Sequence, residues 1–249
     1  MKTIFPKILF NSYKGQNGRM CIIGGSLDYT SAPFYSAISQ LKGGADLAHI
    51  ICTKQAAIPI KSYSPEIIVH PYINALNEQD NKYYDEQQKI GDSLNKITDW
   101  VSAFTSFVIG PGLGRDVWIQ EILGEVFETI IKKQIIVLDA DGMIDVVTNG
   151  KKAYVLLEQS SFKRCGGIGD ILCGLTGLYC YLAFRQSIEK SVSLKQEDVI
   201  LLGCVYSGCI TRKASQMAFA KYNFSLTAPN IIEFIGQCHV TVQDFHILI

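Results

Sequence analysis

Three glycine-rich turns contain the residues of this sequence that could do chemistry. They are Gly24 to Ser26 (GGS), Gly110 to Gly114 (GPGLG) and Gly166 to Asp170 (GGIGD), and each follows an apolar strand pattern or precedes a helical one. Glycine lets the backbone approach a ligand closely, and successive amide N–H groups in such turns can converge on one anion. The sequence therefore predicts loops that bind a phosphate-bearing ligand, although GPGLG alone fits an ordinary strand-to-helix turn equally well.

The segment GGIGD is the most specific of the three. It places flexible amides directly before an apolar helical pattern, and a helix N-terminus adds positive potential that favours phosphate. Asp170 then has two readings. It is either the N-cap of that helix, or a general base that takes a proton from a substrate hydroxyl while the amides of Gly167, Ile168 and Gly169 stabilise a transferring phosphoryl group. Capping explains the aspartate but not the glycines, which favours the base.

Charged residues near these turns leave alternatives open. Asp139 and Asp141 end an apolar strand pattern, where carboxylates either hold Mg²⁺ through water or cap a loop, and capping is the commoner role. Lys163 and Arg164 stand just before the glycines and either meet phosphate or face solvent. GPGLG is not the dinucleotide fingerprint, because GxGxxG requires glycine where Arg115 stands, and no GxxxxGK[ST] loop occurs.

Composition narrows the class of partner. Lys plus Arg and Asp plus Glu both number 23 in 249 residues, and no long run of one sign occurs, so neither nucleic acid nor an anionic membrane surface is an expected partner. The eight cysteines form no CxxC pair and lie mostly in apolar runs, which is typical of a reducing compartment. The four histidines are not spaced with cysteines as a structural zinc site requires. A small-molecule partner is therefore favoured.

Strand and helix patterns alternate through the first half of the chain. Helical spacing from 32 to 45 and from 119 to 131 separates apolar strand patterns at 20–23, 46–52, 66–73, 106–110 and 135–141. A hairpin with its turn at Asn149-Gly150 is expected between 142 and 161. The rest reads as helices that begin near Asp170, Glu197 and Pro229. The apolar stretch 171–184 is shorter than the ~20 residues that cross a bilayer, so we expect a buried helix.

Six segments carry a family resemblance, in order from Lys14 towards the final helices: KGQNGRMCIIGGSLDYTSAPFYSAI, GADLAHIIC, IKSYSPEIIVHPYI, VIGPGLGRD, IVLDADGM and RCGGIGDILCG. Together they resemble the eukaryotic ATP-dependent NAD(P)H-hydrate dehydratases. The resemblance implies a ribokinase-like fold, an α/β class with three α-β-α layers and a mostly parallel central sheet. It also implies a single domain over residues 1–249, with 1–13 as a short N-terminal extension.

The same resemblance implies a repair reaction. ATP phosphorylates the hydrated nicotinamide ring of NADHX or NADPHX, and loss of phosphate restores NADH or NADPH, with Mg²⁺ accompanying ATP. Asp170 matches the catalytic aspartate and also contacts the substrate, as does Gly114. The nucleotide would be lined by Ser160, Ser161, Phe162, Lys163, Arg164, Cys165, Gly166, Gly167, Ile168 and Gly169.

The sequence departs from this family after Met143. Relatives continue there through a helix, a strand that leads to an N-x-x-E-F segment, another helix and a KG-x-x-D strand, whereas this chain goes directly to IDVVTNGKKAYVLL. Asp145 is then the counterpart of the KG-x-x-D aspartate at the nucleotide. Loss of core strands should make the sheet incomplete, expose apolar edges and weaken ligand binding.

Two rival functions remain open at this level. One is a ribokinase-like kinase for a small alcohol, and the other is a non-catalytic or impaired nucleotide-binding module. The expected location is cytoplasmic, with a mitochondrial transit peptide as the alternative because the first residues carry lysines and no acids. A monomer and a homo-oligomer fit the sequence equally.

Overall fold

The chain is described by a computed structural model that covers residues 13–74, 86–114, 117–129, 134–139, 146–148, 153–155, 160–190 and 194–241. At its centre lies a parallel sheet of strands β1 (Arg19–Ile23), β2 (Leu47–Thr53), β3 (Ile68–Ile73), β4 (Ser106–Ile109) and β5 (Ile135–Leu138), in the order β3-β2-β1-β4-β5. The strands form because short β-branched runs can be buried on both faces of such a sheet. Met20 to Ile23 of the central strand are fully buried.

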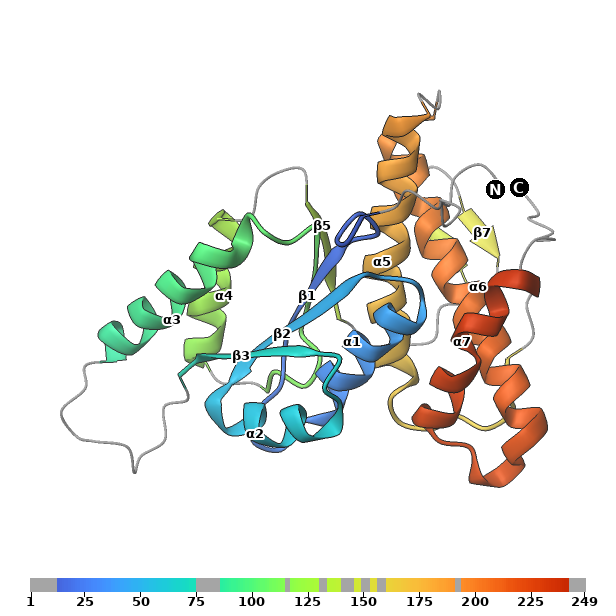
Figure 1. Ribbon diagram of the computed structural model, residues 1–249, viewed down its shortest axis with the longest axis horizontal. Coiled ribbons are helices and arrows are strands. Elements are labelled where there is room, and N and C mark those ends of the chain that lie inside the picture. Colours follow the sequence, from blue (N-terminus) through green and yellow to red (C-terminus); the bar gives the residue numbers. More distant parts are fainter. Residues whose placement is uncertain are drawn as a thin grey trace.

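Helices cover both faces of the sheet (Figure 1). Helices α3 (Glu86–Val101) and α4 (Val117–Thr129) lie on one face, and α1 (Ser31–Lys42) and α5 (Ile168–Glu189) lie on the other. Successive side chains of β1 point to opposite faces of the sheet. Cys21 and Ile23 pack with side chains of α3 and α4, whereas Ile22 packs with those of α1 and α5. The predicted three-layer α/β class with a parallel sheet is therefore confirmed.

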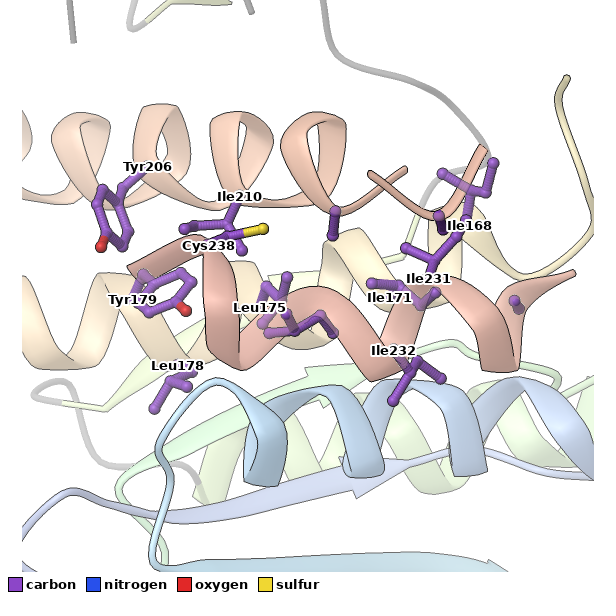
Figure 2. Close-up of a cluster of buried hydrophobic side chains, with 14 of the residues drawn as sticks. Ile168, Ile171, Leu175, Leu178, Tyr179, Tyr206, Ile210, Ile231, Ile232 and Cys238 are labelled. Carbon is purple, nitrogen blue, oxygen red and sulfur yellow. The ribbon is translucent and has the colours of Figure 1, made fainter. Parts of the chain in front are cut away.

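A helical subdomain extends the α5 side. Helices α6 (Gln196–Tyr222) and α7 (Ala228–Thr241), joined by the 3₁₀ turn η1 (Asn223–Ser225), pack outward from α5 (Figure 1). Figure 2 shows the shared core of these helices, in which Leu175 of α5 lies near Ile210 of α6, and Ile171 of α5 lies beside Ile231 of α7. Residues 171–180 of α5 are all buried, as the long apolar stretch predicted. Across the described residues, no helix is both long and apolar enough to span a membrane.

Most predicted elements are present, with shifted ends. The helix expected from 32 to 45 ends at Lys42, and the helix expected to begin at Asp170 begins at Ile168. The hairpin is confirmed as an antiparallel pair of β6 (Val146–Thr148) and β7 (Ala153–Val155), while its turn at Asn149-Gly150 lies outside the described residues.

Helix α2 (Lys54–Tyr63) was not predicted. Its apolar positions are few and it contains Pro59, which normally ends a helical pattern. The helix is instead set by its start, where the Thr53 hydroxyl caps it by accepting a hydrogen bond from Ala56 N at 3.3 Å.

Candidate active site

The first two glycine turns lie side by side at the carboxyl end of the sheet. Gly110 N, just after β4, donates to Ile23 O of β1 at 3.0 Å, and Gly25 N donates to Pro111 O at 2.9 Å. Asp139 continues this edge, because its amide donates to Ile109 O at 2.9 Å. In open parallel sheets, ligands bind at this edge. The GGS and GPGLG turns and Asp139 therefore lie together at one edge of the sheet.

Glycine is required in these turns by the closeness of the two backbones. A side chain at Gly24 would come within 2.2 Å of Pro111 O, and Gly112 has φ +62° with its missing Cβ only 2.8 Å from Tyr29 O. Gly114, the predicted substrate contact, has φ +87° and is exposed, with Ser26 as its near neighbour at 3.7 Å from its Cβ position. Gly114 thus lies where the two turns meet.

The third turn begins α5 in a left-handed conformation. Gly167 is the N-cap with φ 91° and ψ −8°, and a Cβ there would come within 2.8 Å of Ala228 Cβ and 2.9 Å of Tyr35 Cδ2. The helical hydrogen bond from Ile171 N to Gly167 O measures 3.0 Å, so the amides of Gly167, Ile168 and Gly169 precede it and can serve an anion. Asp170 lies in the first turn of the helix. The reading of Asp170 as the N-cap is therefore wrong, because Gly167 occupies that position.

Helix α1 holds the first turn of α5 in place. The Ser36 hydroxyl donates to Asp170 O at 2.9 Å, and the Ser39 hydroxyl lies 3.3 Å from Ile171 O. Contact is close because Gly174 has no side chain, and a Cβ there would lie 2.3 Å from Ser36 O. None of these three residues was predicted from the sequence. Their signal was weak, since two serines three apart in a helix are common and identify a contact only once the facing helix is known.

The carboxylates of Asp139 and Asp170 both affect the pKa of the Cys173 thiol. Burial raises the pKa of the Cys173 thiol, and the negative charges of Asp139 and Asp170 raise it further. The pKa of Tyr35 is also raised, first by burial, then by Tyr63 and by the charge of Asp170. The end of β5 and the start of α5 thus bring two carboxylates to one region, near the buried thiol of Cys173.

The predicted nucleotide loop, 160–169, runs along the helical subdomain. Within it, the Ser161 hydroxyl donates to Lys163 O at 2.6 Å, and the Lys163 ammonium donates to Phe224 O of η1. Phe162 is 94% exposed and meets Phe219 of α6 edge-on, with the ring centroids 5.8 Å apart. Lys163 is therefore held by a backbone carbonyl, which is neither the phosphate contact nor the solvent-facing position that the sequence offered for it. Arg164 is exposed, as the solvent-facing alternative expected.

Some of the other predicted site residues lie within the described part of the chain, and two do not. Ser160, Ile168 and Gly169 follow the same loop into α5, and Cys165 and Gly166 lie between Lys163 and the N-cap, with Cys165 half-buried against the helical core. Asp145 and Asp141 lie outside the described residues. Among the residues that the structure describes, no three His, Cys, Asp or Glu side chains gather as a metal-binding group.

Solved structures identify the class of fold. A hypothetical protein from Streptococcus mutans superimposes with a TM-score of 0.73 at 16% identity, covering 98% of this chain and 97% of that one. A ribokinase-like superfamily protein from Enterococcus faecalis gives a TM-score of 0.68 at 15% identity, covering 95% and 92%. The ADP/ATP-dependent NAD(P)H-hydrate dehydratase from Bacillus subtilis, co-crystallised with ATP and Mg²⁺, gives 0.62 at 13% identity, covering 96% and 94%. The fold is ribokinase-like.

Sequence comparison then identifies the family. The family described as NAD(P)H-hydrate dehydratase matches residues 20–153. The ATP-dependent (S)-NAD(P)H-hydrate dehydratase of Arabidopsis thaliana is 31% identical, over 95% of this chain and 82% of the relative, and that of Drosophila pseudoobscura pseudoobscura is 32% identical, over 94% and 90%. This chain belongs to the NAD(P)H-hydrate dehydratase family.

The comparison with the Arabidopsis relative also bears on the departure after Met143. The alignment spans 307 positions, which exceeds the 249 residues of this chain by 58, so at least 58 positions of the alignment have no residue here. The family match stops at residue 153, whereas GGIGD follows at 166–170. The chain is therefore shorter than its relative in the aligned region.

Proposed function

We propose that this chain catalyses the ATP-dependent dehydration of NADHX and NADPHX to NADH and NADPH. The observation that carries the proposal is the position of Asp170, in the first turn of α5 and directly after the amides of the 167–169 turn, at the carboxyl end of the sheet. Membership of the NAD(P)H-hydrate dehydratase family and relatives named as ATP-dependent enzymes support it.

In the proposed reaction the protein positions charge and moves one proton. Asp170 accepts the proton of the ring hydroxyl as that oxygen attacks the terminal phosphoryl group of ATP. The amides of Gly167, Ile168 and Gly169, with the positive end of α5, stabilise the negative charge on the transferred group. Phosphate then leaves with the electrons of its carbon–oxygen bond, the neighbouring ring carbon loses a proton to water, and the double bond of the reduced ring is restored. Gly114 and Ser26, where the first two turns meet, contact the hydrated dinucleotide.

ATP and Mg²⁺ are the proposed co-substrate and metal. Mg²⁺ usually keeps several waters and is held by one or two carboxylates together with phosphates, and Asp139 and Asp170 supply carboxylates in the same region. When bound, the metal would neutralise charge on the phosphates. Asp139 is the better metal ligand of the two, because Asp170 is needed as a base.

The test is a direct assay of the purified 249-residue chain. NADHX or NADPHX is supplied with ATP and Mg²⁺, and both the return of reduced-nicotinamide absorbance and the release of ADP are followed. The proposal expects the two signals to rise together and to require both substrates. ADP release driven by a small alcohol, with a stable phosphorylated product, would instead identify a kinase.

We further propose that turnover by this chain is weaker than that of its longer relatives. The support is the set of at least 58 alignment positions that it lacks against the Arabidopsis relative. In the same assay, this chain should bind ATP more weakly than the purified Arabidopsis relative and should have the lower kcat/KM. Equal kcat/KM would contradict impairment, and ATP binding with no turnover would identify a nucleotide-binding module.

A cytoplasmic location is proposed as well, with mitochondria as the alternative. It is supported by the eight cysteines, all of which are free thiols, as expected in a reducing compartment. A carboxyl-terminal fluorescent fusion that colocalises with a mitochondrial marker would overturn the cytoplasmic proposal.

A further inference from the structure

Two cysteines face each other across the contact between α5 and α6. The Sγ atoms of Cys180 and Cys204 are 3.5 Å apart. The helices approach closely here because Gly203 precedes Cys204, and a Cβ at Gly203 would come within 2.7 Å of Cys180 Cα. The glycine therefore brings the two backbones together, and the two thiols meet beside it.

The two thiols differ in exposure and in protonation. Cys180 is buried, whereas Cys204 is half-buried. The hydrogen bond between the two thiols, in which either sulfur can be the donor, lowers the pKa of Cys204 and raises the pKa of Cys180. Elsewhere burial raises the pKa of the Cys21 and Cys52 thiols, which lie inside the sheet core. Since the thiolate is the reactive form, Cys204 is the better nucleophile of the pair.

We propose that Cys180 and Cys204 form an oxidation site at which a peroxide converts the two thiols into a disulfide between α5 and α6. The Cys204 thiolate attacks one oxygen of hydrogen peroxide, which forms a sulfenic acid on Cys204 and releases hydroxide, and this hydroxide takes up the proton that the thiol lost and becomes water. The Cys180 thiol then attacks the sulfenic sulfur, its proton goes to the departing hydroxide, and a second water leaves. Two thiols are oxidised and one peroxide is reduced to two waters.

The geometry favours this second step over further oxidation. A resolving thiol 3.5 Å from the sulfenic sulfur is already within contact distance, and the sulfur atoms must approach by about 1.5 Å to bond. Because Gly203 already packs on the Cys180 backbone, side-chain rotation rather than helix movement brings the sulfurs together. The other half-buried cysteine, Cys165, lies in a different region, in the loop before α5.

A disulfide here would link α6 to α5, the helix whose first turn contains Asp170. Cys180 lies ten residues after Asp170 on the same helix, about 15 Å along its axis. The bond would close the segment from 180 to 204 and so restrict the unfolded chain. Oxidised protein should therefore resist heat better than reduced protein while Asp170 keeps its surroundings.

The test uses the full-length purified protein, reduced and then treated with hydrogen peroxide or diamide. Thiols counted under denaturing conditions should fall from eight to six without a change in oligomer size, and peptide mapping should find one linked peptide containing Cys180 and Cys204. The Tm of the oxidised protein should be higher than that of the reduced protein, and dithiothreitol should reverse the increase.

Two variants separate this site from other thiols. On oxidation, C204S should keep all of its remaining thiols and show no increase in Tm. C165S should still form the link between Cys180 and Cys204. The proposal is overturned if wild type keeps all eight thiols, if the linked peptide joins other cysteines, or if C204S responds to the oxidant as wild type does.

Discussion

At the scale of single residues, Asp170 owes its position to neighbours on other elements. Ser36 binds its carbonyl oxygen, and Gly167 begins its helix in a conformation that side chains rarely adopt. The carboxylate therefore stands in the first helical turn, where the positive end of α5 and the preceding amides act on the same small region. A residue that only capped the helix would occupy the position of Gly167 instead.

Asp170→Asn should lower turnover by about 10² to 10⁴-fold, because asparagine cannot accept the hydroxyl proton. The free energy of unfolding should change little, since asparagine keeps the size of the side chain. The measurement is kcat with NADHX and ATP, together with urea unfolding. Asp99→Asn, on the exposed surface of α3, is the matched control and should leave kcat unchanged. Equal turnover by Asp170→Asn and wild type would show that Asp170 is not the base.

A buried histidine pair makes a second prediction at this scale. His49 Nδ1 and His70 Nε2, on neighbouring strands β2 and β3, lie 3.0 Å apart, and the rings pack against Trp100 and Phe104. Burial lowers the pKa of His49 to about 4, with smaller contributions from His70 and Arg19. Burial also lowers the pKa of His70, and Lys61 lowers it further. The folded state thus holds both rings neutral.

Stability should therefore fall as the pH drops from about 6.5 towards 4. In this window the unfolded chain binds protons that the folded chain does not, so the free energy of unfolding decreases by up to about 1.4 kcal/mol per pH unit for each such group. Urea unfolding between pH 4 and 7 measures the slope. His49→Gln, which keeps a hydrogen-bonding group but does not titrate, should have the shallower slope; parallel curves for the two proteins would contradict this.

At the scale of elements, the contact between α1 and α5 determines where the third turn stands. Both helices are buried on their facing sides, and the contact depends on Gly174, whose Cβ position is 2.5 Å from Ser39 Oγ and 2.3 Å from Ser36 O. Interiors are close-packed, so an added methyl group cannot enter without moving a helix. The serine hydroxyls that bind the first turn of α5 would move with it.

Gly174→Ala should destabilise the protein by about 1–3 kcal/mol and lower turnover at the same time, because α1 shifts away from the first turn of α5. Chemical unfolding and kcat are the two measurements. The control is Gly124→Ala on α4, where the added Cβ meets nothing within 4 Å, so stability should rise by up to about 1 kcal/mol. Equal stability of the two alanine variants would contradict the close contact.

At the scale of the whole molecule, the parallel sheet ends at β5 on one side. Ile136 and Leu138 of this strand are 39% and 63% exposed, and among the described strands β5 pairs only with β4. Apolar edge strands are unusual because they offer unpaired backbone groups to other chains. The exposure agrees with the expectation that a chain lacking family segments after Met143 leaves an apolar edge.

Leu138→Lys should therefore reduce self-association of the purified chain, because a charge on an edge strand opposes pairing with a second edge. Sedimentation velocity over a range of concentrations measures the effect, and Tm should stay within a few degrees of wild type. Ile58→Lys is the control, since Ile58 is 78% exposed on α2, away from β5, and should not alter self-association. If both variants and wild type sediment alike at all concentrations, the β5 edge is not an association surface.

Most of the strands and helices, the buried α5 helix and the three glycine turns could be predicted from the sequence. Each depends on local properties: apolar periodicity, helix length and the unusual backbone freedom of glycine. Helix α2 escaped prediction because a single capping threonine outweighed a proline and a weak apolar pattern. Helix ends also shifted, since they depend on caps and packing rather than on periodicity.

Tertiary structure alone decided which distant residues meet. It assigned the N-cap to Gly167 rather than Asp170, placed Ser36 against the Asp170 carbonyl, tied Lys163 to Phe224 and brought Cys180 to Cys204. These contacts join segments far apart in the chain, and small or polar residues carry no periodic signal of their partners. The sequence by itself determined that RCGGIGD can hold an anion beside a carboxylate, while packing of α1 against α5 decided where that carboxylate stands.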